Sequence, residues 1–292
     1  MLRIILIINL FSFGLGATPI VLWHGMGDSC CNPLSLGSFA KHLEKSIPGV
    51  YVKSLQLGSN VFDDVLHGFF MDSNEQVRQA CEMILNDERL KDGYNAIGFS
   101  QGSQFLRAVA QQCGTKMQNL ISFGGQHQGI YGLPKCFYPE KLCNYMRLLL
   151  NKFAYQSWVQ NEFVQAQYWH DPLREKEYVQ GSHFLAEINN ERNFNKTYRK
   201  GLTSLKNFVM VKFLNDTMVV PSESSWFGFY TPGQAENITA LRDSRLYKDN
   251  KDRLGLRQMD KEGKLKFLAV EGDHLHFRVN WIEENIIKPY LK

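Results

Sequence analysis

The stretch Tyr94-Asn95-Ala96-Ile97-Gly98-Phe99-Ser100-Gln101-Gly102 decides the fold of this chain. It begins as a strand and ends in the spacing Gly-x-Ser-x-Gly, in which small residues let the backbone turn sharply from a strand into a helix. Apolar residues then recur at the spacing of one helix face: Phe105, Leu106, Val109 and Cys113. We therefore expect Ser100 on an exposed elbow between a strand and a helix, as a nucleophile.

A serine nucleophile needs a general base, and the base needs a carboxylate that orients it. With this type of elbow, the order along the chain is serine, acid and histidine, each after a strand. Asp216 follows the buried-strand pattern of residues 207–214, and His274 follows a similar pattern at residues 265–270. The order predicts a triad of Ser100, Asp216 and His274.

Two residues of the last loop remain alternatives within that triad. His276 is a second candidate base, and Asp273 is a second candidate acid. Gly272 gives His274 more freedom to reach inward, which favours His274 as the base.

Two backbone N–H groups are expected to bind the negative oxygen of the reaction intermediate, forming an oxyanion hole. One belongs to the residue after the nucleophile, Gln101. The other comes from the loop after an early strand, and the strand at residues 19–23 leads into the loop His24-Gly25-Met26-Gly27-Asp28. We choose Met26 as this second donor. His24 is expected to shape the loop, because the chain order already supplies a base.

Five segments of this sequence resemble the palmitoyl-protein thioesterases, which are lysosomal hydrolases that remove fatty acyl groups from cysteine in S-acylated proteins. The segments are His24–Pro33, Gly98–Gly102, Val209–Thr217, Trp226–Tyr230 and Glu271–Leu275. The resemblance runs from the first strand to the C-terminus. It implies S-acylated proteins and peptides as substrates, a lysosomal location and no metal or cofactor. It also favours His274 over His276, and its functional residues fall on those already chosen: Ser100, Asp216, His274, Met26 and Gln101.

The predicted strands alternate with helical stretches, which is typical of a doubly wound, mostly parallel sheet. They lie at residues 19–23, 50–56, 94–99, 119–123, 208–214 and 265–270. We expect an α/β class and an α/β-hydrolase fold in one domain of residues 17–292. The interval of residues 124–206 is too long for a plain crossover and predicts a large helical insertion between the nucleophile and acid strands.

The insertion is rich in aromatic residues and helix formers. For most of these residues, two interpretations stand equal: the insertion's own small core, or the wall of a groove for a long acyl chain, in which each buried methylene contributes about 0.8 kcal/mol. The cluster Trp226–Tyr230 is expected to line the same groove. The aromatic and apolar residues of the insertion are Phe137, Tyr138, Tyr145, Leu148, Leu149, Leu150, Phe153, Tyr155, Trp158, Phe163, Tyr168, Trp169 and Phe184.

The N-terminal segment has the pattern of a secretory leader. Arg3 precedes an apolar stretch that is too short to span a bilayer, and small residues stand before a cleavage point near Gly16 and Ala17. Residues 1–16 are therefore predicted to be a signal peptide, and no later segment is long enough to span a membrane. Three glycosylation sequons agree with this route to the lysosome or to the medium: Asn195, Asn215 and Asn237.

The net charge of +4 is spread along the 292 residues without a long basic run, so the sequence gives no indication of nucleic-acid binding. Six cysteines in an oxidising compartment favour three disulfides. Cys81 and Cys113 lie on the apolar faces of helices that flank the nucleophile strand and form the natural pair. A local loop can then join Cys136 to Cys143, which leaves Cys30 and Cys31 as adjacent partners. The spacing lacks the paired Cys-x-x-Cys motifs of a zinc site.

Two other functions remain compatible with these patterns. A secreted or lysosomal lipase or carboxylesterase would use the same triad on oxyesters. A non-catalytic lipid carrier would bind acyl chains without turning them over.

Overall fold

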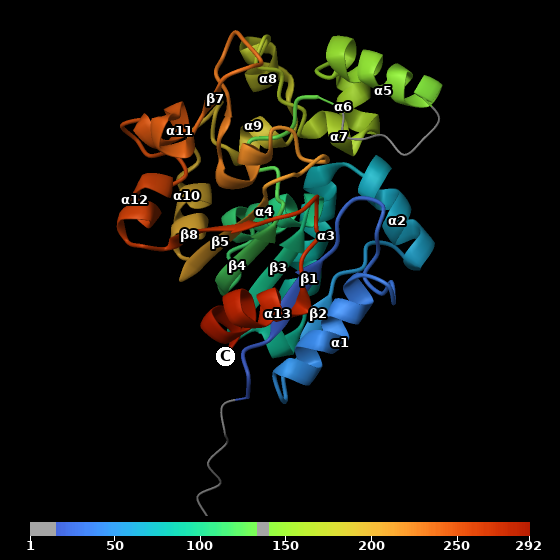
Figure 1. Cartoon of the computed structure of the whole chain (residues 1–292), viewed down its shortest axis with the longest axis vertical. Coiled ribbons are helices and arrows are strands. Elements are labelled where there is room, and N and C mark those ends of the chain that lie inside the picture. The colour runs from blue at the N-terminus through green and yellow to red at the C-terminus, as the bar shows by residue number, and fades with distance from the viewer. Residues whose placement is uncertain (1–15, 133–139) are drawn as a thin grey trace, which may run out of the picture.

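The structure, a computed structural model, describes residues 16–132 and 140–292. The predicted signal peptide, apart from Gly16, lies outside these residues. The centre of the structure is a six-stranded sheet in which every neighbouring pair of strands is parallel, in the order β2-β1-β3-β4-β5-β8 (Figure 1). The strands are β1 Ile20–Trp23, β2 Val52–Ser54, β3 Tyr94–Phe99, β4 Met117–Phe123, β5 Asn207–Phe213 and β8 Leu265–Val270. This sheet confirms the predicted α/β class.

Side chains alternate between the two faces of the sheet, and each face has its own core. Val21 and Trp23 of β1 pack into one core, whereas Ile20 and Leu22 pack into the other. The first core lies under α3 Ser73–Leu85 and α4 Gln101–Gln112, and the second under α1 Leu36–Ser46 and the C-terminal helix. That last helix consists of α13 Val279–Ile282 and its π-helical continuation Glu283–Leu291. Helices thus cover both faces, as a doubly wound sheet requires.

The strand β2, at one edge of the sheet, differs from the four central strands. The four central strands are almost wholly buried, whereas the side chains of β2 are only partly buried. β2 is an edge strand and is shorter than predicted, because its single neighbour, the short strand β1, pairs with it over three residues only.

The interval between β4 and β5 is helical, as the length of residues 124–206 predicts. It contains α5 Glu140–Phe153, α6 Ser157–Glu162, α7 Val164–Gln167, α8 Glu175–Gly181, α9 Leu185–Ile188 and α10 Lys196–Thr203. In Figure 1 most of these helices lie above one edge of the sheet, while α10 lies beside it. Helix α10 returns the chain to the sheet and packs against α4.

A second excursion, between β5 and β8, reaches the same region and was not recognised from the sequence. Its short elements are η2 Ser222–Trp226, β6 Phe229–Tyr230, β7 Ile238–Thr239, η3 Leu241–Asp243, α11 Arg245–Lys248 and α12 Leu256–Lys261. Strands β6 and β7 pair antiparallel, and β7 lies near α8 in Figure 1. The cap over the sheet is therefore built from two separate parts of the chain.

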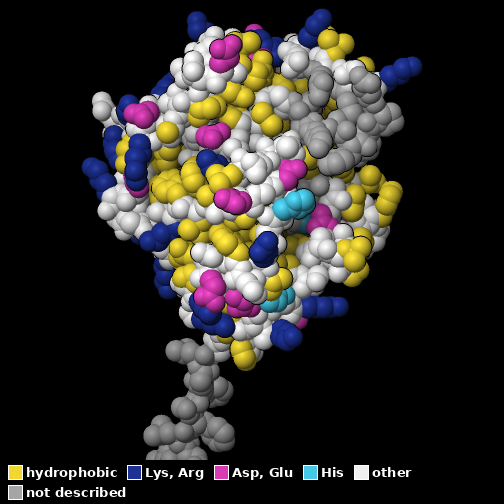
Figure 2. Space-filling view, viewed as in Figure 1, with side chains coloured by type: hydrophobic (Ala, Val, Ile, Leu, Met, Phe, Trp, Pro, Cys, Tyr) yellow, Lys and Arg dark blue, Asp and Glu magenta, His cyan; other side chains and the backbone are white. Residues whose placement is uncertain are grey.

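Two further features agree with the sequence. Disulfides join Cys30 to Cys31 and Cys81 to Cys113, and the latter links α3 to the end of α4. The predicted pair Cys136–Cys143 lies outside the described residues and side chains. On the face seen in Figure 2, lysine and arginine side chains are spread around the periphery rather than gathered in one patch. Over the part of the chain that the structure describes, none of the helices could cross a membrane.

Candidate active site

Ser100 lies at the turn between β3 and α4, in a conformation that side chains rarely adopt. Its φ is 51° and its ψ is −120°, and its N–H donates to the Phe123 carbonyl oxygen at 2.7 Å. A Cβ on Gly98 would lie only 2.5 Å from the Cα of Ser103, and a Cβ on Gly102 would meet the His24 carbonyl oxygen even more closely. The two glycines thus allow the close packing that holds the serine on its elbow.

His274 and Asp216 meet through their side chains after β8 and β5. The Nδ1 of His274 lies 2.7 Å from the Oδ2 of Asp216. The other carboxylate oxygen of Asp216 accepts the N–H groups of Met218 and Val219, both at 2.8 Å. The Asp216 side chain is completely buried, and that of His274 is 10% exposed. Asp216 therefore fixes the orientation of the ring through Nδ1 and leaves Nε2 on the opposite side of the ring.

Asp273, the alternative acid, binds backbone instead of the imidazole ring. Its carboxylate accepts the N–H of His274 at 2.7 Å and the N–H of Thr217 at 2.9 Å, together with the Thr217 hydroxyl at 2.8 Å. These bonds, first that from His274, lower the pKa of Asp273 to about 2. Asp273 thus joins the loop that carries Asp216 to the loop that carries His274.

His274, rather than His276, shares a cavity with Ser100. His276 is exposed and lines a separate groove on the surface. The Nε2 of His274 is buried and makes no hydrogen bond to any described residue, the Ser100 hydroxyl included. The Nε2 atom is therefore free to exchange a proton with a group in the cavity.

The backbone amides of Met26 and Gln101 flank the same serine. Gln101 is the first residue of α4, where a helix leaves its N–H groups without an internal partner. Met26 lines the cavity with Ser100, and a Cβ on the preceding Gly25 would lie 3.1 Å from the Cβ of Ser100. Among the described residues, neither amide donates to a protein acceptor. Both amides can therefore donate to a substrate oxygen.

Two residues near the site were not singled out from the sequence for these positions. The hydroxyl of Tyr168, from the insertion, donates to the side-chain oxygen of Gln101 at 3.1 Å and lies 3.8 Å from the Met26 sulfur. Gly124, with a φ of 58°, faces the His274 ring, since a Cβ there would lie 2.8 Å from its Cε1. In the sequence, a glycine directly after the predicted strand that became β4 could have indicated the contact of Gly124 with His274. Nothing in the spacing indicated the contact of Tyr168 with Gln101.

An apolar cavity of about 510 Å³ opens beside Ser100 and His274, a size typical of small-ligand sites. One side comes from α1 and the other from the segment after His274. Polar groups are few away from the triad. The apolar side chains that line it are Leu34, Leu36, Phe39, Phe99, Met218, Leu275, Phe277, Val279 and Ile282.

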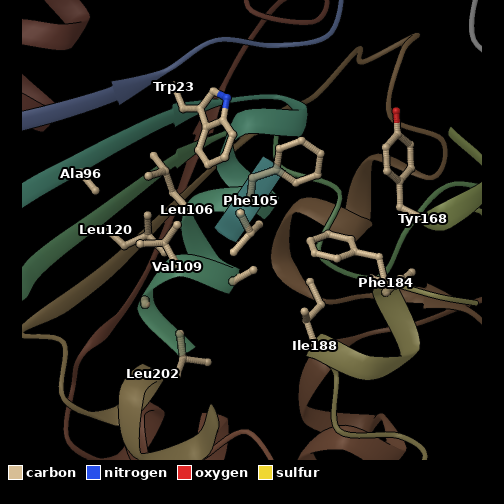
Figure 3. Packing of buried hydrophobic residues seen from close by; sticks show 14 of the residues in the cluster. Trp23, Ala96, Phe105, Leu106, Val109, Leu120, Tyr168, Phe184, Ile188 and Leu202 are labelled. Carbon is tan, nitrogen blue, oxygen red and sulfur yellow. The ribbon is translucent and has the colours of Figure 1, made fainter. Parts of the chain in front are cut away.

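The lining of this cavity differs from the groove expected from the sequence. None of the described insertion aromatics lines it, and neither does the cluster Trp226–Tyr230. Tyr168 and Phe184 are buried in the core around Phe105, as Figure 3 shows, while Trp158 is 52% exposed. The buried rings Tyr168 and Phe184 pack on the α4 side of the sheet, whereas this cavity opens on the α1 side. Phe137 and Tyr138 lie outside the described residues.

Comparisons with known proteins agree with this geometry. A family model described as palmitoyl protein thioesterase matches residues 19–274. The chain is 54% identical over 273 residues to palmitoyl-protein thioesterase 1 of Caenorhabditis elegans, covering 93% of this chain and 91% of that protein. It is 33% identical over 276 residues to palmitoyl-protein thioesterase 3 of Dictyostelium discoideum, covering 93% and 89%. It is also 27% identical over 289 residues to lysosomal thioesterase PPT2 of Homo sapiens, covering 94% and 87%. The chain belongs to the palmitoyl protein thioesterase family.

Proposed function

We propose that this protein is a serine hydrolase that cleaves thioester-linked long-chain acyl groups, such as palmitate, from cysteine in S-acylated proteins or peptides. One observation carries the proposal: Ser100 on its strained elbow and the Asp216-bound His274 line one apolar cavity. Family membership supports the same chemistry, because the relatives reported above are named as thioesterases.

In the first step, Ser100 attacks the thioester carbonyl carbon. The Nε2 of His274 takes the hydroxyl proton, and Asp216 stabilises the resulting imidazolium. The amides of Met26 and Gln101 donate to the carbonyl oxygen as it becomes negative. The carbon–sulfur bond then breaks, and the cysteine sulfur takes up the proton that His274 holds and leaves as a thiol, which returns the ring to its neutral state.

In the second step, water replaces the cysteine. His274 removes a proton from the water as it attacks the acyl-serine, and the same two amides bind the second oxyanion. The bond to Ser100 breaks, the serine oxygen recovers its proton from His274, and the fatty acid leaves. Each residue therefore returns to its starting state.

The acyl chain occupies the cavity between α1 and residues 275–282. Its apolar lining, which includes Phe39 and Phe277, removes methylenes from water at about 0.8 kcal/mol each. Affinity is therefore expected to rise with chain length until the cavity is full.

The same proposal includes the processing of the chain. Residues 1–16 act as a signal peptide that directs one domain, residues 17–292 with its insertion at about 124–206, into the secretory route. Asn195, Asn215 and Asn237 receive glycans there, and the enzyme works in lysosomes or is secreted. The name of the human relative, a lysosomal thioesterase, supports the lysosomal destination.

Hydrolysis of acyl-cysteine peptides by the purified mature protein tests the proposal against its alternatives. We expect turnover that rises from acetyl to palmitoyl thioesters, with poorer rates for matched oxyesters. Preference for the oxyesters would identify a lipase or carboxylesterase. Binding of fatty acid without turnover, and without fluorophosphonate labelling of Ser100, would identify a lipid carrier.

A further inference from the structure

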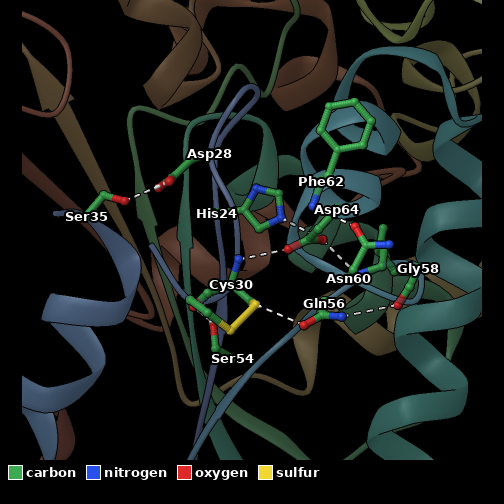
Figure 4. The surroundings of a disulfide bond; sticks show 12 residues. His24, Asp28, Cys30, Ser35, Ser54, Gln56, Gly58, Asn60, Phe62 and Asp64 are labelled. Carbon is green, nitrogen blue, oxygen red and sulfur yellow. Dashed lines mark hydrogen bonds and ion pairs between the residues drawn. A yellow bond between two sulfur atoms is a disulfide. The ribbon is translucent and has the colours of Figure 1, made fainter. Parts of the chain in front are cut away.

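His24, two residues before Met26 in the chain, makes a buried side-chain contact with Asp64 (Figure 4). Their exposed fractions are 4% and 1%, and the Nε2 of His24 lies 3.1 Å from the Oδ1 of Asp64. His24 directly follows β1, while Asp64 belongs to α2 Val61–Phe70, forty positions later in the chain. Burying a carboxylate costs free energy unless the carboxylate is paired and hydrogen-bonded, so Asp64 needs partners for both of its oxygens.

The Asp64 carboxylate has further partners that hold it in place. Oδ1 accepts the N–H of Leu57 at 2.7 Å, and Oδ2 accepts the N–H of Cys30 at 2.8 Å. From its place on α2, Asp64 thus contacts three other parts of the chain: Leu57 after β2, Cys30 of the vicinal disulfide, and His24. A carboxylate anchored on three sides is a rigid acceptor for the histidine ring.

The second ring nitrogen of His24 faces the backbone of the oxyanion loop. Its Nδ1 lies 2.8 Å from the carbonyl oxygen of Gly25. A carbonyl and a carboxylate are both acceptors, so the ring satisfies both only with a proton on each nitrogen, as an imidazolium. Burial lowers the pKa of His24, but the hydrogen bond and charge of Asp64, the Gly25 carbonyl and the charge of Asp28 outweigh it and raise the pKa.

The carbonyl of Gly25 and the N–H of Met26 belong to the same peptide group. Because that group is planar and trans, its C=O and N–H point in opposite directions. A hydrogen bond that fixes the Gly25 carbonyl therefore also fixes the direction of the Met26 N–H. Asp28 N–H shares the same carbonyl at 3.3 Å, a longer contact.

We propose that the His24–Asp64 pair is a positioning device that holds the Gly25–Met26 peptide plane so that the Met26 amide faces the oxyanion. The inference rests on the proposed function, because it assigns a role at the same site. His24 touches no reacting atom; it acts through the peptide it holds. A neutral ring keeps only one of its two protons, and that proton stays on Nε2 because the charged Asp64 carboxylate is a stronger acceptor than the Gly25 carbonyl. The peptide plane is therefore held below the pKa of His24 and released as the pH rises through it.

The test compares Asp64→Asn and His24→Gln with the unmodified enzyme. Asp64→Asn removes the charge that keeps His24 protonated, whereas His24→Gln leaves both backbone bonds of Asp64 intact and so guards against a loss of folding. Because one oxyanion donor is worth about 10²–10³-fold in kcat, we expect kcat to fall about 10- to 100-fold in each variant. KM is expected to stay unchanged, since neither residue lines the cavity.

The chain offers a matched control in His170 and Glu175. His170 is also 4% exposed, with Nδ1 at 2.8 Å from the Gln128 carbonyl oxygen and Nε2 at 2.9 Å from Glu175. That pair lies at a cavity that Ser100 does not line. Glu175→Gln should therefore leave kcat and its pH profile unchanged.

The pH profile separates positioning from mere stability. Between about pH 5 and about pH 8, the alkaline loss of kcat should move to lower pH in Asp64→Asn, because His24 then loses its proton earlier. An unchanged profile, or an equal fall in kcat for Glu175→Gln, would overturn the inference. Thermal unfolding of each variant shows whether the compared proteins are folded.

The rate at which a fluorophosphonate labels Ser100 gives a readout that needs no turnover. We expect labelling to slow about 10-fold or more in Asp64→Asn and His24→Gln, because the phosphonyl oxygen uses the same two amides. Normal labelling rates in both folded variants would contradict the inference alone. A wild-type enzyme that is labelled but does not hydrolyse palmitoyl thioesters would instead contradict the proposed function.

Discussion

At the scale of single residues, the site depends on a serine held in an unfavourable backbone conformation and on a histidine oriented by one acid. Ser100→Ala, Asp216→Ala and His274→Ala should each lower kcat by about 10⁴-fold, and a triple variant should be little worse than the worst single one, because the three act as a unit. Steady-state hydrolysis of a palmitoyl-cysteine peptide measures this. His276→Ala is the matched control, and a loss there with near-normal activity in His274→Ala would show that the base is misassigned.

A second single residue, Asp273, is expected to make the stability of the folded protein depend on pH. Its folded pKa of about 2 lies below the unfolded value near 3.9, so its bonds to His274 and Thr217 stabilise the protein above that value and are lost as the pH falls toward 2. Asp273→Asn should lower the thermal midpoint near neutral pH, and its difference from wild type should shrink below about pH 4. Glu271→Gln, in the same loop, is the control. A difference that stays constant down to about pH 2 would rule this account out.

At the scale of elements, the disulfide between Cys81 and Cys113 fastens α3 to the end of the nucleophile helix α4. The two cysteines are 32 positions apart, so the closed loop predicts a loss of about 3.7 kcal/mol when both are replaced by alanine. Urea unfolding with non-reducing peptide mapping measures this loss. The kcat of the folded fraction should be unaffected, and a double variant as stable as wild type would refute the prediction.

Helix α1 supplies one side of the cavity beside Ser100, and this predicts a change of chain-length preference. Ser38 lines the cavity and lies outside the buried core, so Ser38→Trp should fill part of the cavity without removing any core packing. The kcat/KM for palmitoyl peptides should then fall about 10-fold or more, since each displaced methylene is worth about 0.8 kcal/mol, while acetyl peptides should react normally. Glu44→Trp, at an exposed position of α1 that does not line the cavity, is the control. Equal effects on both substrates would place the acyl chain elsewhere.

At the scale of the whole molecule, the secretory route predicts where the chain carries modifications. Asn215 and Asn237 are exposed, and Asn195 caps α10 through its side-chain oxygen, which accepts the Thr197 N–H at 2.9 Å and leaves its nitrogen for a sugar. Protein secreted by eukaryotic cells should begin near Ala17 and carry glycans at these positions. Mass spectrometry after enzymatic deglycosylation, which converts each modified asparagine to aspartate, tests this. Unmodified asparagine at all three positions would contradict the proposed route.

The strands, the elbow and the order of the triad could be predicted from the sequence because each depends on local features. Gly98 and Gly102 determine a sharp turn within five residues, and short apolar runs predict buried strands wherever they occur. The predicted bounds of β3 and β8 agree with the structure residue for residue. Predicted strands also place Asp216 and His274 near one another, because the carboxyl ends of parallel strands meet at one edge of the sheet.

Only the tertiary structure decided the contacts between distant segments. The spacing left Asp273 and Asp216 as alternatives, and the packing of two loops assigned the imidazole to Asp216 and the backbone to Asp273. Likewise, the aromatic residues of the insertion are equally suited by composition to a core or a groove, and only the structure shows that Tyr168 and Phe184 join the core around Phe105 while the cavity beside Ser100 lies against α1. The sequence by itself indicated which residues meet at the site, since local backbone preferences and strand order are encoded over a few residues. Which surfaces enclose the substrate depends on how helices pack, and that depends on side chains far apart in the chain.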